Sequence, residues 1–230
     1  MFRILDLFCC EGGAALGYHS AGFEVVGVDL NPRFRKRYPF EFRSGDALEF
    51  VRNYGDEFDA IHASPPCQAY SITKHSHHKK HPQLIEPTRK ALQDSGKPYI
   101  IENVVGAPLV DPVLLCWGMF FEAGSVLDDD GTPLRMERHR LFETNWGLHQ
   151  PDHPAHDRSV WVGGSYGGTS RSKYEAKHIR KGGYVPSKAV QEKLLGVHHM
   201  TLHGLHQSVP PAYTQFVGGE LVKHLERTHV

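Results

Sequence analysis

Two residues that could carry covalent chemistry each follow an apolar run of the chain. Cys67 comes after the run FDAIHA, in the stretch SPPCQAYS, where Pro65 and Pro66 stiffen the backbone. Glu102 closes a second apolar run, KPYIIENV. A rigidly held thiol can act as a nucleophile, and a nearby carboxyl group can act as an acid. The structural alternatives are a small buried residue for Cys67 and a hydrogen-bonding pair for Glu102 and Asn103.

This pair of groups suits methyl transfer to C5 of a pyrimidine. C5 of cytosine is a poor nucleophile while the ring is conjugated. A thiolate that adds to C6 breaks the conjugation, and a carboxyl group at N3 and the exocyclic amine takes up the electron density. C5 can then attack a methyl sulfonium. Loss of the C5 proton and elimination of the cysteine restore the ring.

A further set of residues predicts a nucleoside pocket beside the pair. The turn in DLFCCEGG opens a helix, so backbone N–H groups can approach a ligand closely, although the stretch is not a G-x-G-x-x-G motif. Asp29 ends the next apolar run, where a carboxylate can accept hydrogen bonds from ribose hydroxyls. Asp46 follows a third run, where it could meet an adenine amino group. Each residue alone fits an ordinary turn, but together they favour a cofactor pocket.

Alternating strands and helices must position these residues. The apolar runs predict strands, and the segments between them predict helices, one with Asn31 as N-cap and Pro32 in its first turn. The alternation predicts an α/β, Rossmann-like fold, mostly a parallel sheet with helices on both faces. Its carboxyl edge would gather the candidate residues. The expected strands cover residues 3–8, 23–30, 40–44, 58–63 and 97–104.

The pattern changes after residue 110. Residues 125–144 read as a hairpin around an aspartate–glycine turn. Residues 145–186 are rich in glycine and histidine and predict a loop-rich appendage. A helix with Ser187 as N-cap follows, and an amphipathic helix covers 210–228. The expected domains are a core over 1–144, an appendage over 145–186, and returning helices over 187–230.

The composition of the chain limits the kinds of partner that the protein can bind. The 230 residues carry 26 Lys and Arg and 26 Asp and Glu, so the whole surface is not a general polyanion binder. No stretch is apolar enough to cross a bilayer, and we expect a cytoplasmic protein without membrane contact. Basic residues concentrate in residues 171–193 and after PPCQ.

No metal site is predicted from spacing. The four cysteines show neither paired metal-ligand spacing nor a secreted-domain framework, so we expect free thiols. The histidines of TKHSHHKKH could bind zinc, but no cysteine or carboxylate lies near them in the sequence. Phosphate contact by the neighbouring lysines is the favoured interpretation.

In these motifs the chain resembles the DNA (cytosine-5) methyltransferase family, in order and over nearly its whole length. DLFCCEGGAALGYHSAGFEVVGVDLNP resembles the family's S-adenosylmethionine-binding motifs, and GDA resembles the next. SPPCQAYS resembles the catalytic motif, while ENV and RHRLFET resemble two later ones. QSVPPAYTQFVGGEL resembles the last motif, whose helix returns to the cofactor site.

The resemblance implies a role for each matching residue. Cys67 would be the nucleophile, Glu102 the carboxyl that contacts the base, and Pro66 would shape the catalytic loop. Arg140, with Arg138 nearby, would orient the base. The cofactor, S-adenosyl-L-methionine, would contact Phe8, Cys10, Gly12, Gly13, Asp29, Leu30, Asp46, Ala47, Ser64, Gln207 and Ser208. Gln68 and Ser71 would begin the segment that closes over DNA. The local concentration of positive charge, and not the resemblance, predicts further DNA contacts by Lys74, Lys79, Lys80, Arg171, Lys173, Lys177, Arg180 and Lys181.

The chain departs from the family pattern at several positions. Cys10 and Glu11 replace a glycine and a hydrophobic residue, Asp29 replaces a glutamate, and Gln207 stands where asparagine is typical. The region equivalent to the target-recognition domain is short. Methyl transfer to RNA or to a free nucleotide therefore stays open beside duplex DNA with a flipped cytosine. A binding module without turnover is disfavoured because the reactive residues are present.

The compact size suggests, by analogy, a modification enzyme of bacterial or phage origin. We expect a monomer, with an accessory specificity partner as an option, since a short recognition region offers little surface for reading a site.

Overall fold

A mixed, mostly parallel sheet forms the centre of the molecule. The computed structural model describes residues 1–70, 82–166 and 183–228. Within these parts the main sheet has seven strands in the order β3-β2-β1-β4-β5-β9-β6, and β9 alone runs opposite to the other six. The α/β fold class predicted from the sequence is confirmed. The strands are β1 Arg3–Leu7, β2 Glu24–Asp29, β3 Glu41–Ser44, β4 Ala60–Ala63, β5 Tyr99–Asn103, β6 Val113–Leu115 and β9 Arg140–Thr144.

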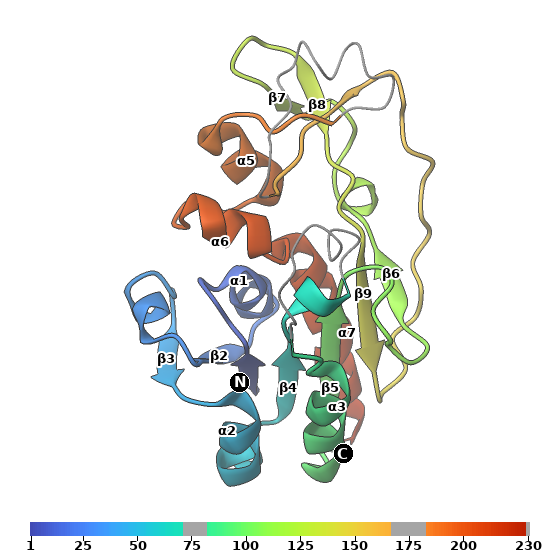
Figure 1. Ribbon diagram of the computed structural model, residues 1–230. Helices are drawn as coiled ribbons and strands as arrows, with labels where there is room; N and C mark the ends of the chain where they lie inside the picture. Colours follow the sequence, from blue (N-terminus) through green and yellow to red (C-terminus); the bar gives the residue numbers. More distant parts are fainter. Residues whose placement is uncertain (71–81, 167–182, 229–230) are drawn as a thin grey trace.

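Helices cover both faces of this sheet (Figure 1). On one face α1 (Gly13–Ser20) packs against α7 (Pro211–Thr228), and on the other α2 (Ala47–Tyr54) lies beside α3 (Ile85–Asp94). The strand period of two separates the two cores: Ile4 joins the α1–α7 core, whereas its neighbour Leu5 joins the α2–α3 core. Burial on both faces explains why the strands read as continuous apolar runs.

A smaller group of elements lies at the end of the molecule opposite to α2 and α3 (Figure 1). Its core includes Trp117, Leu134, Val190 and Leu194, and the Trp117 indole N–H donates to the Leu194 carbonyl at 2.7 Å. The group consists of the strands β7 Val126–Leu127, β8 Pro133–Arg135 and β10 Trp161–Val162, the 3-10 helix η5 Trp117–Met119, and the helices α5 Lys188–Leu195 and α6 Leu202–Gln207.

One prediction about the strands is wrong. The sequence predicts a hairpin whose second arm runs to residue 144, but the hairpin is only β7 and β8 around the turn at Gly131. Residues 140–144 form β9, which pairs with β5 and β6 in the main sheet. The apolar pattern of a strand does not specify its partner, and tertiary contacts selected a different one here.

Two predicted helix N-caps, Asn31 and Ser187, are confirmed. Asn31 accepts a hydrogen bond from the backbone N–H of Arg33 at the start of the 3-10 helix η1 (Pro32–Lys36), and Ser187 caps α5. Pro87 lies in the first turn of α3, where no intrahelical donor is lost. The domain boundaries at 144 and 186 stay predictions, although β7, β8 and α5 share the smaller core. Within the described residues, no helix combines the length and apolarity needed to cross a membrane.

Candidate active site

A cavity of about 530 Å³ opens at the carboxyl edge of the main sheet. Side chains from both ends of the chain line it, from Asp6 to Val209. Many residues named from the sequence are among them: Phe8, Cys10, Gly13, Asp29, Leu30, Asp46, Ala47, Ser64, Pro66, Cys67, Gln68, Glu102, Arg140, Gln207 and Ser208. The structure therefore brings the predicted reactive residues and the predicted cofactor residues to one continuous cavity.

The loop that carries Cys67 is held by a neighbouring strand. Cys67 begins the 3-10 helix η3 (Cys67–Ala69) just after β4. The Asn103 side-chain amide donates to the Pro65 carbonyl at 2.9 Å, and this contact is buried. Burial, followed by the charge of Glu102, raises the pKa of the Cys67 thiol, while Arg140 acts in the opposite direction.

Glu102 pairs with an arginine across two antiparallel strands. The Arg140 Nε lies 3.0 Å from Glu102 Oε1, and the Glu102 side chain is almost fully buried. Burial raises the pKa of Glu102 despite the opposing charge of Arg140. A raised pKa favours the protonated carboxyl, which can donate a hydrogen bond to a ring nitrogen of a base.

A buried chain of hydrogen bonds lies behind Glu102. Ser64 bonds to Glu102, the His62 Nε2 lies 2.9 Å from the Ser64 hydroxyl, and the Tyr18 hydroxyl lies 2.9 Å from His62 Nδ1. Burial lowers the pKa of His62 to about 3, so its imidazole stays neutral at ordinary pH. A neutral ring can link Tyr18 to Ser64 without placing a charge beside Glu102.

Arg138 occupies a different position from Arg140. Its guanidinium donates to the carbonyls of Ser165 at 2.7 Å, His206 at 2.9 Å and Ser208 at 2.7 Å, and the residue does not line the cavity. Burial, together with the charge of Arg140, lowers the pKa of Arg138 to about 9. These contacts indicate that Arg138 supports the rim of the cavity.

The turn after β1 forms the side of the cavity that the sequence predicts to hold the cofactor. Phe8 and Cys10 adopt positive φ angles of 59° and 48°, which is uncommon for residues with a side chain. The Asp29 carboxylate accepts from the backbone N–H of Cys10 at 3.1 Å and of Asn31 at 2.9 Å. Asp29 therefore fixes this turn, and its remaining lone pairs can still meet a ribose.

Other predicted cofactor residues have structural contacts as well. Asp46 Oδ1 accepts from the backbone N–H groups of Leu48 and Glu49, so Asp46 is the N-cap of α2. Gly12 does not line the cavity. Gly13 does, and a side chain there would collide with Ser208, because a Cβ on Gly13 would lie 2.1 Å from the Ser208 hydroxyl oxygen.

Sequence reasoning missed several residues of the cavity. Asp6 is buried, accepts from the Tyr38 hydroxyl at 3.0 Å and has its pKa raised to about 7 by burial. Glu11, noted only as a departure, accepts from Thr201 at 2.6 Å and 2.7 Å and thereby joins α6 to the turn. Met200, His203 and His206 also line the cavity, but α6 has no motif that would identify it.

Several predicted DNA contacts lie outside the described residues. These are Ser71, Lys74, Lys79, Lys80, Arg171, Lys173, Lys177, Arg180 and Lys181. Gln68 is exposed at the mouth of the cavity.

Comparison with known proteins agrees with the fold and the motifs. Residues 2–107 match the family model described as C-5 cytosine-specific DNA methylase. A protein of Methanocaldococcus jannaschii, provisionally named ribosomal RNA large subunit methyltransferase, is 27% identical over 173 residues. The Type II methyltransferase M.XorII of Xanthomonas oryzae pv. oryzae is 30% identical over 118 residues. These alignments cover 66% and 44% of this chain but only 40% and 28% of the two relatives.

A solved structure matches the whole fold. It is a prophage-encoded protein of E. coli, provisionally described as a DNA modification methyltransferase. The alignment has a TM-score of 0.61, covers 98% of this chain and 100% of that one, and has 15% identity, so it shows the shared fold. In sequence, residues 2–107 are thus similar to the family described as C-5 cytosine-specific DNA methylase.

Proposed function

We propose that this protein transfers a methyl group from S-adenosyl-L-methionine to C5 of a cytosine in DNA, through a covalent bond between Cys67 and C6. The observation that carries the proposal is the meeting of Cys67, Glu102 and Arg140 in a cavity that continues to Asp29 and Asp46. One part offers a nucleophile and an acid, and the other offers carboxylates for a nucleoside.

The residues of the cavity fit the cofactor. Asp29 and Asp46 supply acceptors for hydroxyl and amino groups, and Phe8 and Leu30 supply apolar surface. When bound, S-adenosyl-L-methionine would supply an electrophilic methyl group beside the target carbon.

Each reactive residue has a different role toward the base. Cys67, as the thiolate, adds to C6, while protonated Glu102 donates to N3 and withdraws electron density from the ring. Arg140 holds the Glu102 carboxyl at 3.0 Å and favours the thiolate of Cys67 electrostatically. Because the cavity is a recess, a base in duplex DNA must leave the stack to reach Cys67.

RNA is the second candidate substrate. The Methanocaldococcus jannaschii relative carries a ribosomal RNA name, whereas the Xanthomonas relative is named as a Type II methyltransferase. The family model and the Type II relative favour DNA, and a modification enzyme of this kind would act in the cytoplasm. Transfer of tritiated methyl groups to duplex DNA, RNA and dCMP compares the substrates directly.

The covalent step has its own test. DNA that carries 5-fluorocytosine at the target should form an adduct that survives denaturation, because fluorine at C5 cannot leave as a proton. The Cys67→Ala variant should form none, and DNA with ordinary cytosine is the control for trapping. An adduct that persists in Cys67→Ala would exclude Cys67 as the nucleophile.

A further inference from the structure

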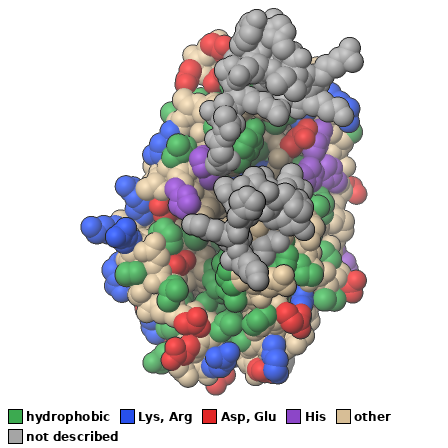
Figure 2. All heavy atoms as spheres, viewed as in Figure 1, with side chains coloured by type: hydrophobic (Ala, Val, Ile, Leu, Met, Phe, Trp, Pro, Cys, Tyr) green, Lys and Arg blue, Asp and Glu red, His purple; other side chains and the backbone are tan. Residues whose placement is uncertain are grey.

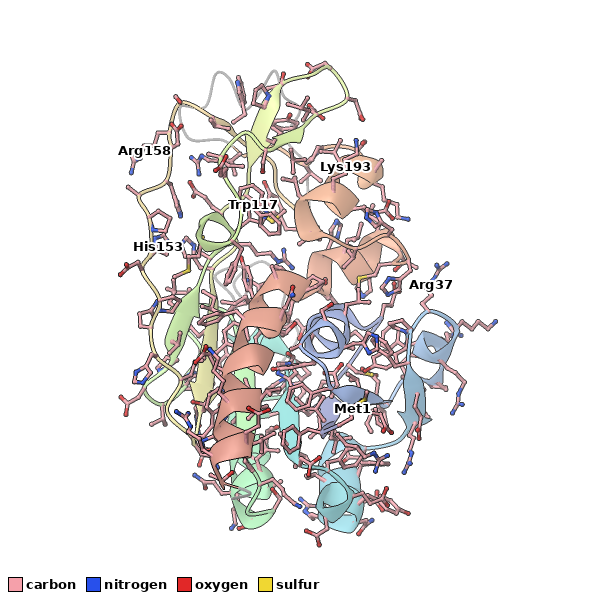
Figure 3. The ribbon with its side chains drawn as sticks, turned by 180° about the vertical axis from the view of Figure 1, so that it is seen from behind. Met1, Arg37, Trp117, His153, Arg158 and Lys193 are labelled. Atoms are coloured by element: carbon pink, nitrogen blue, oxygen red, sulfur yellow. The ribbon has the colours of Figure 1, made fainter. Side chains whose placement is uncertain are left out.

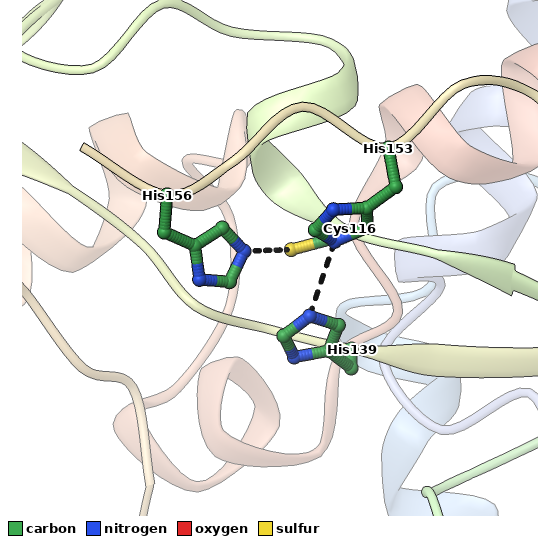
Figure 4. A group of neighbouring side chains, drawn as sticks. All are labelled: Cys116, His139, His153 and His156. Atoms are coloured by element: carbon green, nitrogen blue, oxygen red, sulfur yellow. Dashed lines mark hydrogen bonds between the residues drawn. The ribbon is translucent and has the colours of Figure 1, made fainter.

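A cysteine and three histidines meet outside the active-site cavity. They are Cys116, His139, His153 and His156, whose ligand atoms all lie within 4.8 Å of one another (Figure 4). Cys116 follows β6, and His139 precedes β9. His153 and His156 belong to the irregular segment after β9, where Figure 3 shows His153 on the outer edge of the molecule.

The distances suit a tetrahedral metal ion. Cys116 Sγ lies 3.4 Å from His156 Nε2, and His139 Nε2 lies 3.2 Å from His153 Nε2. Bond lengths of about 2.0–2.1 Å to nitrogen and about 2.3 Å to sulfur place tetrahedral zinc ligands roughly 3.3–3.6 Å apart. These two pairs of atoms therefore lie close to the spacing of such ligands, and all four ligand atoms lie within 4.8 Å of one another.

Neighbouring groups prepare two ligands for a cation. The Nδ1 of His156 lies 3.2 Å from Glu137 Oε1, and a hydrogen bond from Nδ1 to this carboxylate would leave the Nε2 lone pair free to face a cation. A carboxylate behind a ligating histidine is a recurrent feature of zinc sites. Backbone N–H groups of Trp117, Gly118 and Arg138 also approach the Cys116 sulfur and orient it, while burial raises the pKa of this thiol.

We propose that Cys116, His139, His153 and His156 bind one structural zinc ion. One sulfur and three imidazole nitrogens suit this borderline-soft cation, and four protein ligands close the coordination sphere, as in structural rather than catalytic sites. Cys116 directly follows β6 and His139 directly precedes the neighbouring strand β9, and the exposed side chain of His153 leaves a path for the ion from solvent.

The zinc ion would fix the backbone beside the active site. His139 stands between Arg138, which supports the cavity rim, and Arg140, which pairs with Glu102. The His139 carbonyl also accepts from the Arg140 guanidinium at 2.9 Å. The ion would join this turn to the segment that holds His153 and His156, which otherwise has no regular structure up to β10.

The test measures metal content and coordination in the full chain. Protein purified without added chelator should contain about one zinc ion per chain, and Cys116→Ala and His153→Ala should each lose most of it. His149→Ala is the matched control, because this exposed histidine lies in the same segment outside the cluster. Replacement by Co²⁺ should give a sulfur-to-cobalt charge-transfer band and the intense visible bands of a tetrahedral site, and Cys116→Ala should lose the charge-transfer band.

The outcomes are distinct. Full zinc content in both Cys116→Ala and His153→Ala would overturn the proposal and direct attention to other histidines. Wild-type protein without zinc that also fails to bind added Zn²⁺ or Co²⁺ would overturn it as well. Because His153 is exposed, its variant should fold, so loss of zinc there reports on binding and not on misfolding.

Discussion

Cys67 lies between groups of opposite charge, and these set its reactivity. Burial raises the pKa of the Cys67 thiol most, and Glu102 raises it further. Arg140 and Arg138 act in the opposite direction. The thiolate is the nucleophilic form, so the free protein holds Cys67 mostly as the thiol at neutral pH.

We expect Glu102→Gln to shift the reaction of Cys67 with iodoacetamide to lower pH. Once Glu102 has ionised, its negative charge disfavours the Cys67 thiolate, and the variant removes that charge, so the pKa of Cys67 should fall. Mass spectrometry of the Cys67 peptide over a pH series measures the alkylation rate. Glu220→Gln, on the exposed side of α7, should leave the profile unchanged. The same profile in Glu102→Gln and the wild type would contradict the coupling.

Asp6 should make stability depend on pH. Its folded pKa is about 7, above the ordinary 3.8, so between these values the folded state binds the proton more tightly than the unfolded state. The contribution of Asp6 to the free energy of unfolding is therefore present below about pH 4 and is lost as the pH rises toward about 7.

Asp6→Asn should remove this contribution. Urea unfolding of the wild type and variant at several pH values should show a smaller loss of stability in the variant between about pH 4 and 7. The difference between the two proteins isolates Asp6 from the other titrating groups. Parallel curves would mean that Asp6 is ionised in the folded protein.

At the scale of elements, an ion pair joins α3 to β9. Arg89 donates to both Glu143 oxygens, at 2.7 Å and 2.8 Å, and both side chains are buried. The backbone N–H of Val110 donates to the same carboxylate at 2.8 Å. Because the pair is fully hydrogen-bonded, removing one partner leaves a buried charge uncompensated.

Arg89→Ala should therefore reduce the free energy of unfolding by about 3–5 kcal/mol. Lys90→Ala, one residue further along α3, breaks only an exposed pair with Asp94 and should change it by less than about 1 kcal/mol. Chemical denaturation of both variants gives the comparison. Similar losses in the two variants would show that burial does not control the strength of these pairs.

The elements also show what a sequence can predict. Asn31 and Ser187 were identified as caps because a cap depends on residues within one helical turn. The partner of β9 was missed because pairing depends on distant strands. The helix α6 was missed because its six residues are too few to establish a period.

The difference between local and long-range contacts also decides which residues of the active-site cavity and of the proposed zinc site the sequence predicts. Cys67 and Glu102 follow apolar runs directly, so parallel-sheet topology predicts that they meet. Cys116 and its three histidines are spread over residues 116–156, so their spacing in the sequence does not indicate a metal site. Glu11 and Thr201 meet across 190 positions of sequence, and only the folded chain brings them together.

At the scale of the whole molecule, charge must be segregated for a polyanion to bind. The net charge is zero, and Figure 2 shows Lys and Arg side chains mainly along the left and lower edges of the face in view. The basic residues 171–181, which lie outside the described residues, stay the predicted docking segment.

Neutralising Lys173 and Lys177 together should weaken DNA binding and flatten its dependence on salt. Each lost phosphate contact should reduce the log–log slope by about one unit. Fluorescence anisotropy across a salt series measures this, with calorimetry of S-adenosyl-L-methionine binding as the control that should not change. An unaltered slope would remove these residues from the docking surface and favour RNA or a nucleotide as the substrate.

The cavity also has a particular order of assembly. Its wall between Met200 and Val209 packs onto the turn that holds Glu11, through the hydrogen bonds of Thr201 and His199 to that residue. During translation, every other lining residue leaves the ribosome before this wall does. A nascent chain that has formed the sheet therefore still lacks one side of this cavity until residues 200–209 have also left the ribosome.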